Sequence, residues 1–237
     1  MKKLILAAFA LTTAASVFAQ GSVVFNNRVV GAYLQHVYAP LATAPTFSQI
    51  GNGTADLLGG TNGSTSWAGF SLIGNLGTAG IYQGATTIAQ LLAGNGFNQT
   101  EASLVPMSPI ATFRTGAAAG FLQGAIVATA ANVPATVSSS GQATLEMVAW
   151  DNSTGLYTTW GDASTVGTAD WAWQHGLIAA GESGRWNDIL GGAGAPPSSP
   201  PNPQAPSFNL YLVPEPSTFA LAGLGLAALV AFRRRNK

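Results

Sequence analysis

The chain has 237 residues, no cysteine and only 8% charged residues, against about 25% in ordinary globular proteins. Residues 20–212 hold three Arg, no Lys and eight acidic residues, a formal charge of 3 − 8 = −5 that excludes nucleic acid as an expected partner. The missing cysteines exclude disulfides, and an apolar content of 47% with six Trp excludes a disordered composition.

The first residues show the three parts of a secretory signal in order. Lys2 and Lys3 form a positive start, residues 4–11 are apolar, and small residues lead to Ala19. This order predicts a signal peptide over residues 1–19, cut by signal peptidase before Gln20. An amphipathic helix of a soluble protein is the alternative. The predicted signal makes the chain an exported protein.

Short strands separated by turn residues are predicted across the next 190 residues. Residues 142–150 are the clearest, since Ala143, Leu145 and Met147 alternate with polar positions. After a turn, Leu156–Trp160 is expected to return as the partner strand. The other predicted strands are Ser22–Asn26, Ala32–Tyr38, Ser66–Ile73, Ala111–Thr115, Phe121–Ala128 and Phe208–Val213.

Two segments do not fit a strand pattern clearly. Thr86–Leu92 fits a strand or a helix, and Trp171–Ala180 is predicted as a short helix. The many short strands predict an all-β fold, a single jelly-roll-like β-sandwich domain over residues 20–212. Residues 191–206 hold six Pro and are expected to form a loop before the final strand; the alternative is that the domain ends near Leu190.

The C-terminal residues combine an apolar stretch with a basic end. Phe219–Phe232 is uncharged and is followed by Arg233, Arg234 and Arg235. At about 1.5 Å per residue this stretch reaches about 21 Å, short of a hydrocarbon core of about 30 Å. Residues 217–232 are therefore expected to be a short transmembrane helix, with the basic residues 233–237 in the cytoplasm.

The motif Pro214-Glu215-Pro216, followed by this apolar stretch and the Arg-rich end, resembles the PEP-CTERM sorting signal of polysaccharide-producing bacteria. The resemblance covers residues 213–237. It implies a partner, a membrane-embedded protease of the exosortase type, that recognises the tripeptide and processes a membrane-anchored precursor. The product is then expected at the cell surface or outside the cell. A plain C-terminal membrane anchor is the alternative.

The sequence offers few residues of the kinds that enzymes use in catalysis. His36 and His175 are the two histidines, no nucleophile motif or calcium loop occurs, and two His without Cys make a zinc site improbable. His175 is interpreted as a solvated side chain beside tryptophans, and Glu146 as a solubilising residue on the polar face of a strand. No catalytic residue, metal or cofactor is expected.

The six tryptophans suggest a possible ligand. Aromatic faces stack on sugar rings, so Trp171 and Trp173 are candidates for glycan stacking, with core packing as the alternative for every Trp. The leading hypothesis is a non-enzymatic surface or extracellular-matrix protein. A carbohydrate-binding module comes second, favoured by an exposed planar row of Trp. An extracellular hydrolase comes last, favoured by a cleft that pairs two carboxylates.

Overall fold

A computed structural model describes residues 22–76, 81–124, 126–129, 142–189 and 205–214, together with Arg233. The predicted signal peptide, the apolar segment 217–232, and Glu215, Pro216, Arg234 and Arg235 lie outside the described residues. Among the residues that are described, no helix has the length and apolar character needed to cross a membrane.

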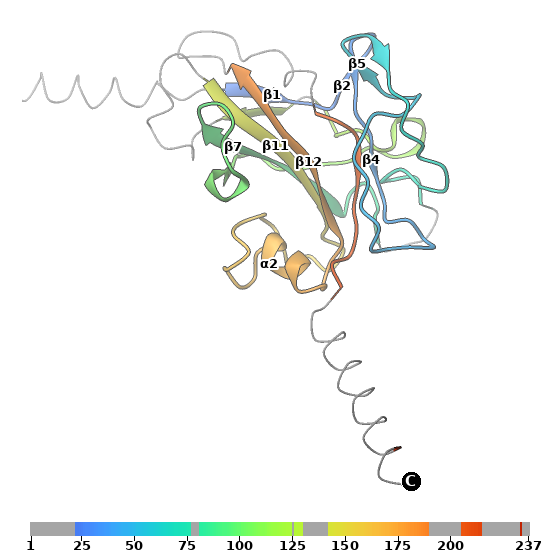
Figure 1. The fold of residues 1–237 in the computed structure, drawn as a ribbon, viewed down its shortest axis with the longest axis vertical. Coiled ribbons are helices and arrows are strands. Elements are labelled where there is room, and N and C mark those ends of the chain that lie inside the picture. Colours follow the sequence, from blue (N-terminus) through green and yellow to red (C-terminus); the bar gives the residue numbers. More distant parts are fainter. Residues whose placement is uncertain are drawn as a thin grey trace, which may run out of the picture.

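An antiparallel sheet of five strands forms the centre of the fold (Figure 1). Its path runs β12-β11-β7-β8, and β9 pairs with β7 beyond the part that β8 occupies. The strands are β7 (Thr87–Asn95), β8 (Val105–Pro106), β9 (Ala111–Thr112), β11 (Gln142–Asp151) and β12 (Ala180–Ile189).

β7 resolves the strand-or-helix ambiguity in favour of a strand. It pairs with β11 over its whole length and with β8 and β9 on its other edge. Ala89 and Leu91 are buried on one face, while Ile88 and Leu92 are buried on the other. A strand covered on both faces is apolar at nearly every position, so its sequence lacks the alternation that would distinguish it from a helix.

Smaller sheets cover one face of the central sheet, and a short helix covers the other (Figure 1). The small strands are β1 (Ser22–Phe25), β2 (Arg28–Val29), β3 (Tyr33–Leu34), β4 (Val37–Tyr38), β5 (Leu57–Leu58), β6 (Thr61–Asn62), β10 (Ile126–Thr129) and β13 (Phe208–Asn209). The helical elements are η2 (Glu101–Ser103), η3 (Gly116–Ala118) and α2 (Ala169–Gln174). The described chain is thus mostly β, as predicted, but these pairings do not establish a jelly roll.

Two apolar clusters lie on opposite faces of the central sheet. The larger contains Leu91, Leu145 and Phe208 and lies toward the small sheets. The smaller contains Trp150, Trp160 and other residues on the α2 side. Since both faces are buried, the polar residues that alternate along β11 do not face open solvent.

The predicted hairpin after β11 is wrong. Leu156–Trp160 forms no strand, and β11 pairs instead with β7 and with β12. The loop is held by side-chain bonds: Tyr157 donates its backbone N–H to the Asn152 side chain, and the Trp150 indole N–H donates to the Tyr157 carbonyl. The sequence did not predict β12, because its first eight residues include no β-branched residue. These residues are Ala-Gly-Glu-Ser-Gly-Arg-Trp-Asn.

Three further predictions are wrong in whole or in part. Ser66–Ile73 forms no strand and contributes one bridge, between Leu72 and Tyr38. The predicted strand Ala32–Tyr38 forms two short strands, β3 and β4. Between them, Gln35 donates its backbone N–H to the Asn27 carbonyl. The predicted helix 171–180 is the shorter α2, capped by the Thr168 hydroxyl, which accepts from the backbone N–H of Trp171.

Candidate functional site

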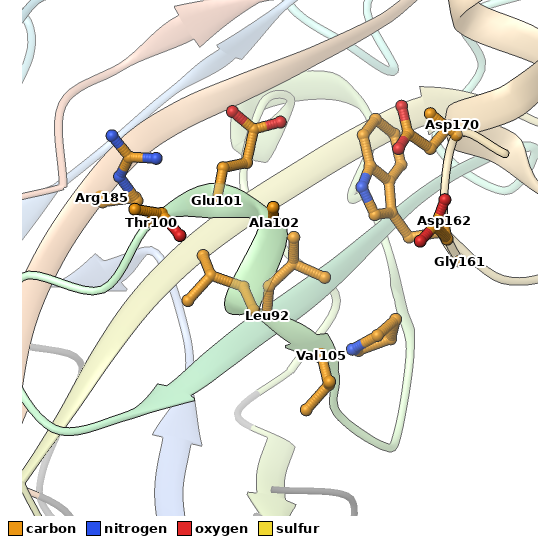
Figure 2. Close-up of a pocket in the computed structure, with 13 residues that line it drawn as sticks. Leu92, Thr100, Glu101, Ala102, Val105, Gly161, Asp162, Asp170 and Arg185 are labelled. Carbon is orange, nitrogen blue, oxygen red and sulfur yellow. The ribbon is translucent and has the colours of Figure 1, made fainter.

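A cavity of about 690 Å³ opens on the α2 side of the central sheet (Figure 2). Acidic, apolar and basic side chains from four parts of the chain form its wall. The residues that line it are Leu92, Thr100, Glu101, Ala102, Leu104, Val105, Pro106, Trp160, Gly161, Asp162, Ala163, Asp170 and Arg185. Its size falls within the roughly 300–1,000 Å³ typical of small-molecule sites.

Strand register places Glu146 beneath this cavity. Glu146 pairs with Leu92 of β7 on one side and with Arg185 of β12 on the other. Residues directly opposite each other in an antiparallel pair point to the same face. Leu92 and Arg185 both line the cavity, so the Glu146 side chain lies on the same face of the sheet, although Glu146 itself is not among the lining residues.

A β-bulge brings two charged residues of β12 to that same face. The register of β11 with β12 shifts between Glu146 and Val148, so that Ser183 and Gly184 together oppose Met147. Val148 therefore pairs with Glu182. Bulges commonly re-aim side chains near functional sites. Here the bulge aligns Glu182 with Glu146 and Arg185, although strict alternation would put residues 182 and 185 on opposite faces.

Glu146 is buried, contrary to the surface role expected for it. Its exposed fraction is 3%, and its Oε2 atom has no hydrogen-bond partner. Burial, reinforced by the negative charge of Glu101 and opposed by Arg185, raises the pKa of Glu146 to about 7. The prediction failed because η2 and α2 cover this face of the sheet, which the alternation pattern treats as exposed.

Glu182 belongs to the same group of carboxyls. Burial raises the pKa of Glu182 to about 8, with further contributions from the charges of Glu146, Glu101 and Asp170. A hydrogen bond to Glu101 also favours the protonated form of Glu182. The pKa of Asp170 is likewise raised, mainly by burial, while a hydrogen bond from Gln174 opposes the shift. Glu146 and Glu182 thus hold protons near neutral pH.

The grouping of these acids bears on the chemistry open to the cavity. Glycosidases use two acids about 5–10 Å apart, and the charges of Glu101, Glu146 and Asp170 all act on Glu182. Within the described part of the chain, no three His, Asp or Glu residues are grouped as a metal site requires. What the acids can do is accept hydrogen bonds from, and neutralise, a positively charged group.

Neither histidine joins the cavity. His175 is exposed and stacks on Trp171, with ring centroids 4.4 Å apart, and its Nδ1 bonds to the Trp171 carbonyl. His36 lies in the other half of the molecule, where its Nδ1 is 2.5 Å from the Asp56 carboxylate.

The tryptophans lie mostly in the interior. Trp150, Trp160 and Trp173 form a chain of tilted rings with centroids 5.7 Å apart, and Trp186 is buried on the opposite face. Trp173 is 3% exposed, and its indole N–H donates to the Tyr211 carbonyl. Trp171 is half-buried, and its ring stacks on His175.

Trp67 is the other half-buried tryptophan. It stacks on Tyr38 with centroids 4.1 Å apart and meets Phe70 edge-on at 78°. The described residues therefore hold no planar row of exposed tryptophans.

Sequence reasoning did not single out Glu101 or Arg185, and it named Glu182 only as one of six candidate carboxylates for glycoside hydrolysis. They come from η2 and β12, which are separated by about eighty residues and carry no recognisable spacing. The sequence holds one sign of the bulge, Gly184 between Ser183 and Arg185. An isolated Gly within a strand suggests a bulge. Because residues 180–189 were not predicted as a strand, this glycine could not be interpreted as a bulge.

Of the predicted sorting residues, the structure describes Pro214 and Arg233. Val213 packs partly buried against the smaller apolar cluster, and Pro214 is exposed. Of the basic end, Arg233 is described and is exposed.

Comparison with known proteins bears on the C-terminal residues. No curated protein and no solved structure matches the chain. Residues 212–235 match the PEP-CTERM protein-sorting motif. This motif indicates an exported protein with a membrane-associated precursor that is processed by an exosortase, a membrane protease. The chain carries a PEP-CTERM sorting signal, as its sequence predicted.

Proposed function

We propose that this chain is an exported surface or extracellular-matrix protein with a non-catalytic, β-rich mature domain. The match at residues 212–235 is the observation that carries the proposal. Signal peptidase removes residues 1–19, and the segment 217–232 holds the precursor in the membrane with Arg233, Arg234 and Arg235 in the cytoplasm. An exosortase then processes the chain at Pro214-Glu215-Pro216.

The position of the motif suits this processing. Leu210 is fully buried, Tyr211 exchanges two backbone hydrogen bonds with Ala180, and Leu212 donates its backbone N–H to the Pro45 carbonyl. Pro214, the first residue of the motif, is exposed. A protease can therefore reach the motif without unfolding the domain, and the cut leaves the last strand in place.

The proposal is tested by replacing Pro214, Glu215 and Pro216 with alanine in the native host. Full-length protein should then accumulate in the membrane fraction. The matched control replaces Pro196 and Pro197, which lie in the Pro-rich stretch outside the motif, and it should be processed normally. Unchanged release of the motif variant would show that the tail is a plain anchor.

Carbohydrate binding is a second candidate function, supported by Trp171. Its half-buried ring stacks on His175 and lies beside Asp170 and Gln174, which can hydrogen-bond to sugar hydroxyls. Such binding is weak per site, since one aromatic contact contributes about 0.5–1.5 kcal/mol beyond area burial, and it varies little with salt. Pull-down of the full chain on a panel of glycans should show retention at low and high salt that Trp171→Ala removes.

A hydrolase is the third candidate, since the cavity does bring carboxyls together. The burial of Glu146 disfavours a role for that acid, because an acid that takes part in hydrolysis must reach the sugar or the attacking water. Hydrolysis of any glycan by the purified chain, lost in Glu101→Gln, would replace the non-catalytic proposal.

A further inference from the structure

The C-terminal residues leave the packed domain at one end of the central sheet, and α2 lies at the same end (Figure 1). Tyr211 exchanges backbone hydrogen bonds with Ala180, the first residue of β12. Leu212 donates its backbone N–H to the carbonyl of Pro45, in the loop after β4. Pro214, two residues further on, is exposed. The loop after β4 and the turn before β12 therefore border the point where the chain leaves the domain.

Apolar side chains lie on both sides of this point. On the side of the loop after β4, Phe47 is 46% exposed, and its ring centroid lies 6.3 Å from that of half-buried Phe70. On the other side, Leu177 is 52% exposed in the turn between α2 and β12. The antiparallel bridge at the start of β12 directs this turn toward Pro214. We name the surface that contains Phe47, Phe70, Leu177 and Pro214 the exit face.

The exit face is uncharged on the side of Phe47. Residues 29–100 contain one acidic residue and no Lys or Arg, and that acid, Asp56, is fully buried. Covering this surface with lipid would therefore leave no ion without its water. Half-buried Trp67 meets Phe70 edge-on, with ring centroids 5.1 Å apart, and it adds an amphipathic ring of the kind enriched at membrane–water interfaces.

The length of the remaining chain limits how far the exit face can lie from a bilayer. Residues 217–232 are the membrane anchor in the proposed function, on which this inference rests. From Pro214 to Ser217 a fully extended backbone spans at most about 11 Å. The headgroup layer on each side of the hydrocarbon core is about 5–8 Å thick. An anchor of about 24 Å is shorter than a core of about 30 Å, and this mismatch draws Pro214 closer to the lipid.

From these observations we infer that the exit face of the anchored precursor lies on the lipid surface of the bilayer. Phe47, Phe70 and Leu177 then contact the headgroup region and lose contact with water, which disfavours orientations in which the domain tilts away. This orientation holds the sorting motif at the level of a membrane-embedded protease. A single myristoyl chain binds membranes only marginally, so three partly exposed side chains cannot retain the domain after the anchor is removed. Contact with the membrane therefore ends with processing.

The test uses single cysteine variants of the full chain, which has no cysteine of its own. Phe47→Cys and Leu177→Cys are labelled with a fluorophore and reconstituted in vesicles of phosphatidylethanolamine and phosphatidylglycerol whose headgroups carry nitroxide quenchers. The matched control is Ile189→Cys, which is also exposed but lies at the other end of β12, about 30 Å from Ala180. We expect the labels at residues 47 and 177 to lose most of their fluorescence and the label at residue 189 to keep it.

Flotation of the vesicles after alkaline extraction measures the anchor separately from the exit face. A chain that does not float would overturn the proposed anchor and this inference together. A chain that floats while the labels at residues 47 and 177 keep their fluorescence, or while the label at residue 189 is quenched equally, would overturn the inference alone. An unquenched label at residue 47 that becomes protected when exosortase is added would assign the exit face to the protease and not to lipid.

Discussion

Glu182 and Arg185 point to the same face of β12, three residues apart, because Ser183 and Gly184 bulge together opposite Met147. Gly184 has a φ of +75°, and a Cβ there would meet nothing within 4 Å. The Ser183 hydroxyl accepts from the Met147 backbone N–H, which replaces the ladder bond lost at the bulge. The arrangement of the acidic cavity therefore depends on one left-handed residue.

Replacing that glycine should destabilise the domain through backbone strain alone. We expect Gly184→Ala to lower the free energy of unfolding by about 1–2 kcal/mol, since left-handed backbone costs this much for a residue with a Cβ. Gly184→Asn should cost less, because Asn tolerates this conformation. Urea unfolding measures both. Equal stability of the alanine variant and the original would show that the strand straightens without cost.

The buried carboxyls predict that the domain loses stability as pH rises. The pKa values of Glu146 and Glu182, about 7 and about 8, lie above the unfolded value of about 4.3. The folded state therefore binds more protons between these limits, and their contribution to stability, complete below pH 4, declines as the pH rises toward 8. Melting temperatures measured from pH 5 to pH 8 should fall.

Glu146→Gln isolates this effect, because an amide resembles the protonated acid. The variant should gain stability over the original at pH 8, by up to about 3 kcal/mol, and should differ little at pH 5. Asp188→Asn serves as control and should leave the pH dependence unaltered. A Gln variant that is less stable at pH 8 would mean that the ionised form of Glu146 is the one that the fold stabilises.

The buried pair of His36 and Asp56 should hold together the small-sheet side of the domain. Asp56 is fully buried, and it also accepts from the Gly53 backbone N–H at 2.5 Å. Removing one partner of a buried pair leaves the other unpaired, so Asp56→Ala should cost about 3–5 kcal/mol. Exposed Asp162→Ala should cost less than about 1 kcal/mol. A loss at Asp56 as small as that at Asp162 would contradict the structural role of the pair.

The C-terminus of the released protein should lie at or beyond Val213. Phe208 and Leu210 are fully buried, and the backbone of residues 210–212 bonds to Tyr38, Ala180 and Pro45. A cut before Leu210 would remove this packing, at a cost of about 2–5 kcal/mol for one buried leucine. Mass spectrometry of material released by the native host locates the terminus. An end upstream of Leu210 in a folded product would contradict the assignment of this segment to the core.

The N-terminus of the same material should be Gln20. The ordered basic, apolar and small-residue regions predict cleavage after Ala19. N-terminal sequencing decides it, because a product that begins at Met1 would rule out the signal peptide.

The sequence by itself determined what can be recognised from short, contiguous patterns. The sorting signal is one, because its tripeptide, apolar stretch and basic end follow each other along the chain. The mostly β class and the strand at residues 142–151 are others, since alternation and β-rich composition are local properties. Alternation also placed Ala143, Leu145 and Met147 on one face, where they join the larger core.

The acidic cavity was decided only by the tertiary structure. Glu101, Glu146 and Glu182 meet because β11 pairs with a strand of weak β propensity, because a bulge rotates that strand, and because η2 and α2 cover the face between them. Strand pairing, the bulge and the covering of the sheet face all depend on contacts between residues far apart in the sequence. The local spacing of residues does not reveal them. The same packing explains why Glu146 and Trp173 are buried, although both were expected to be accessible. A sequence pattern shows which residues share a face, and only the packing of other elements shows whether that face is exposed to water.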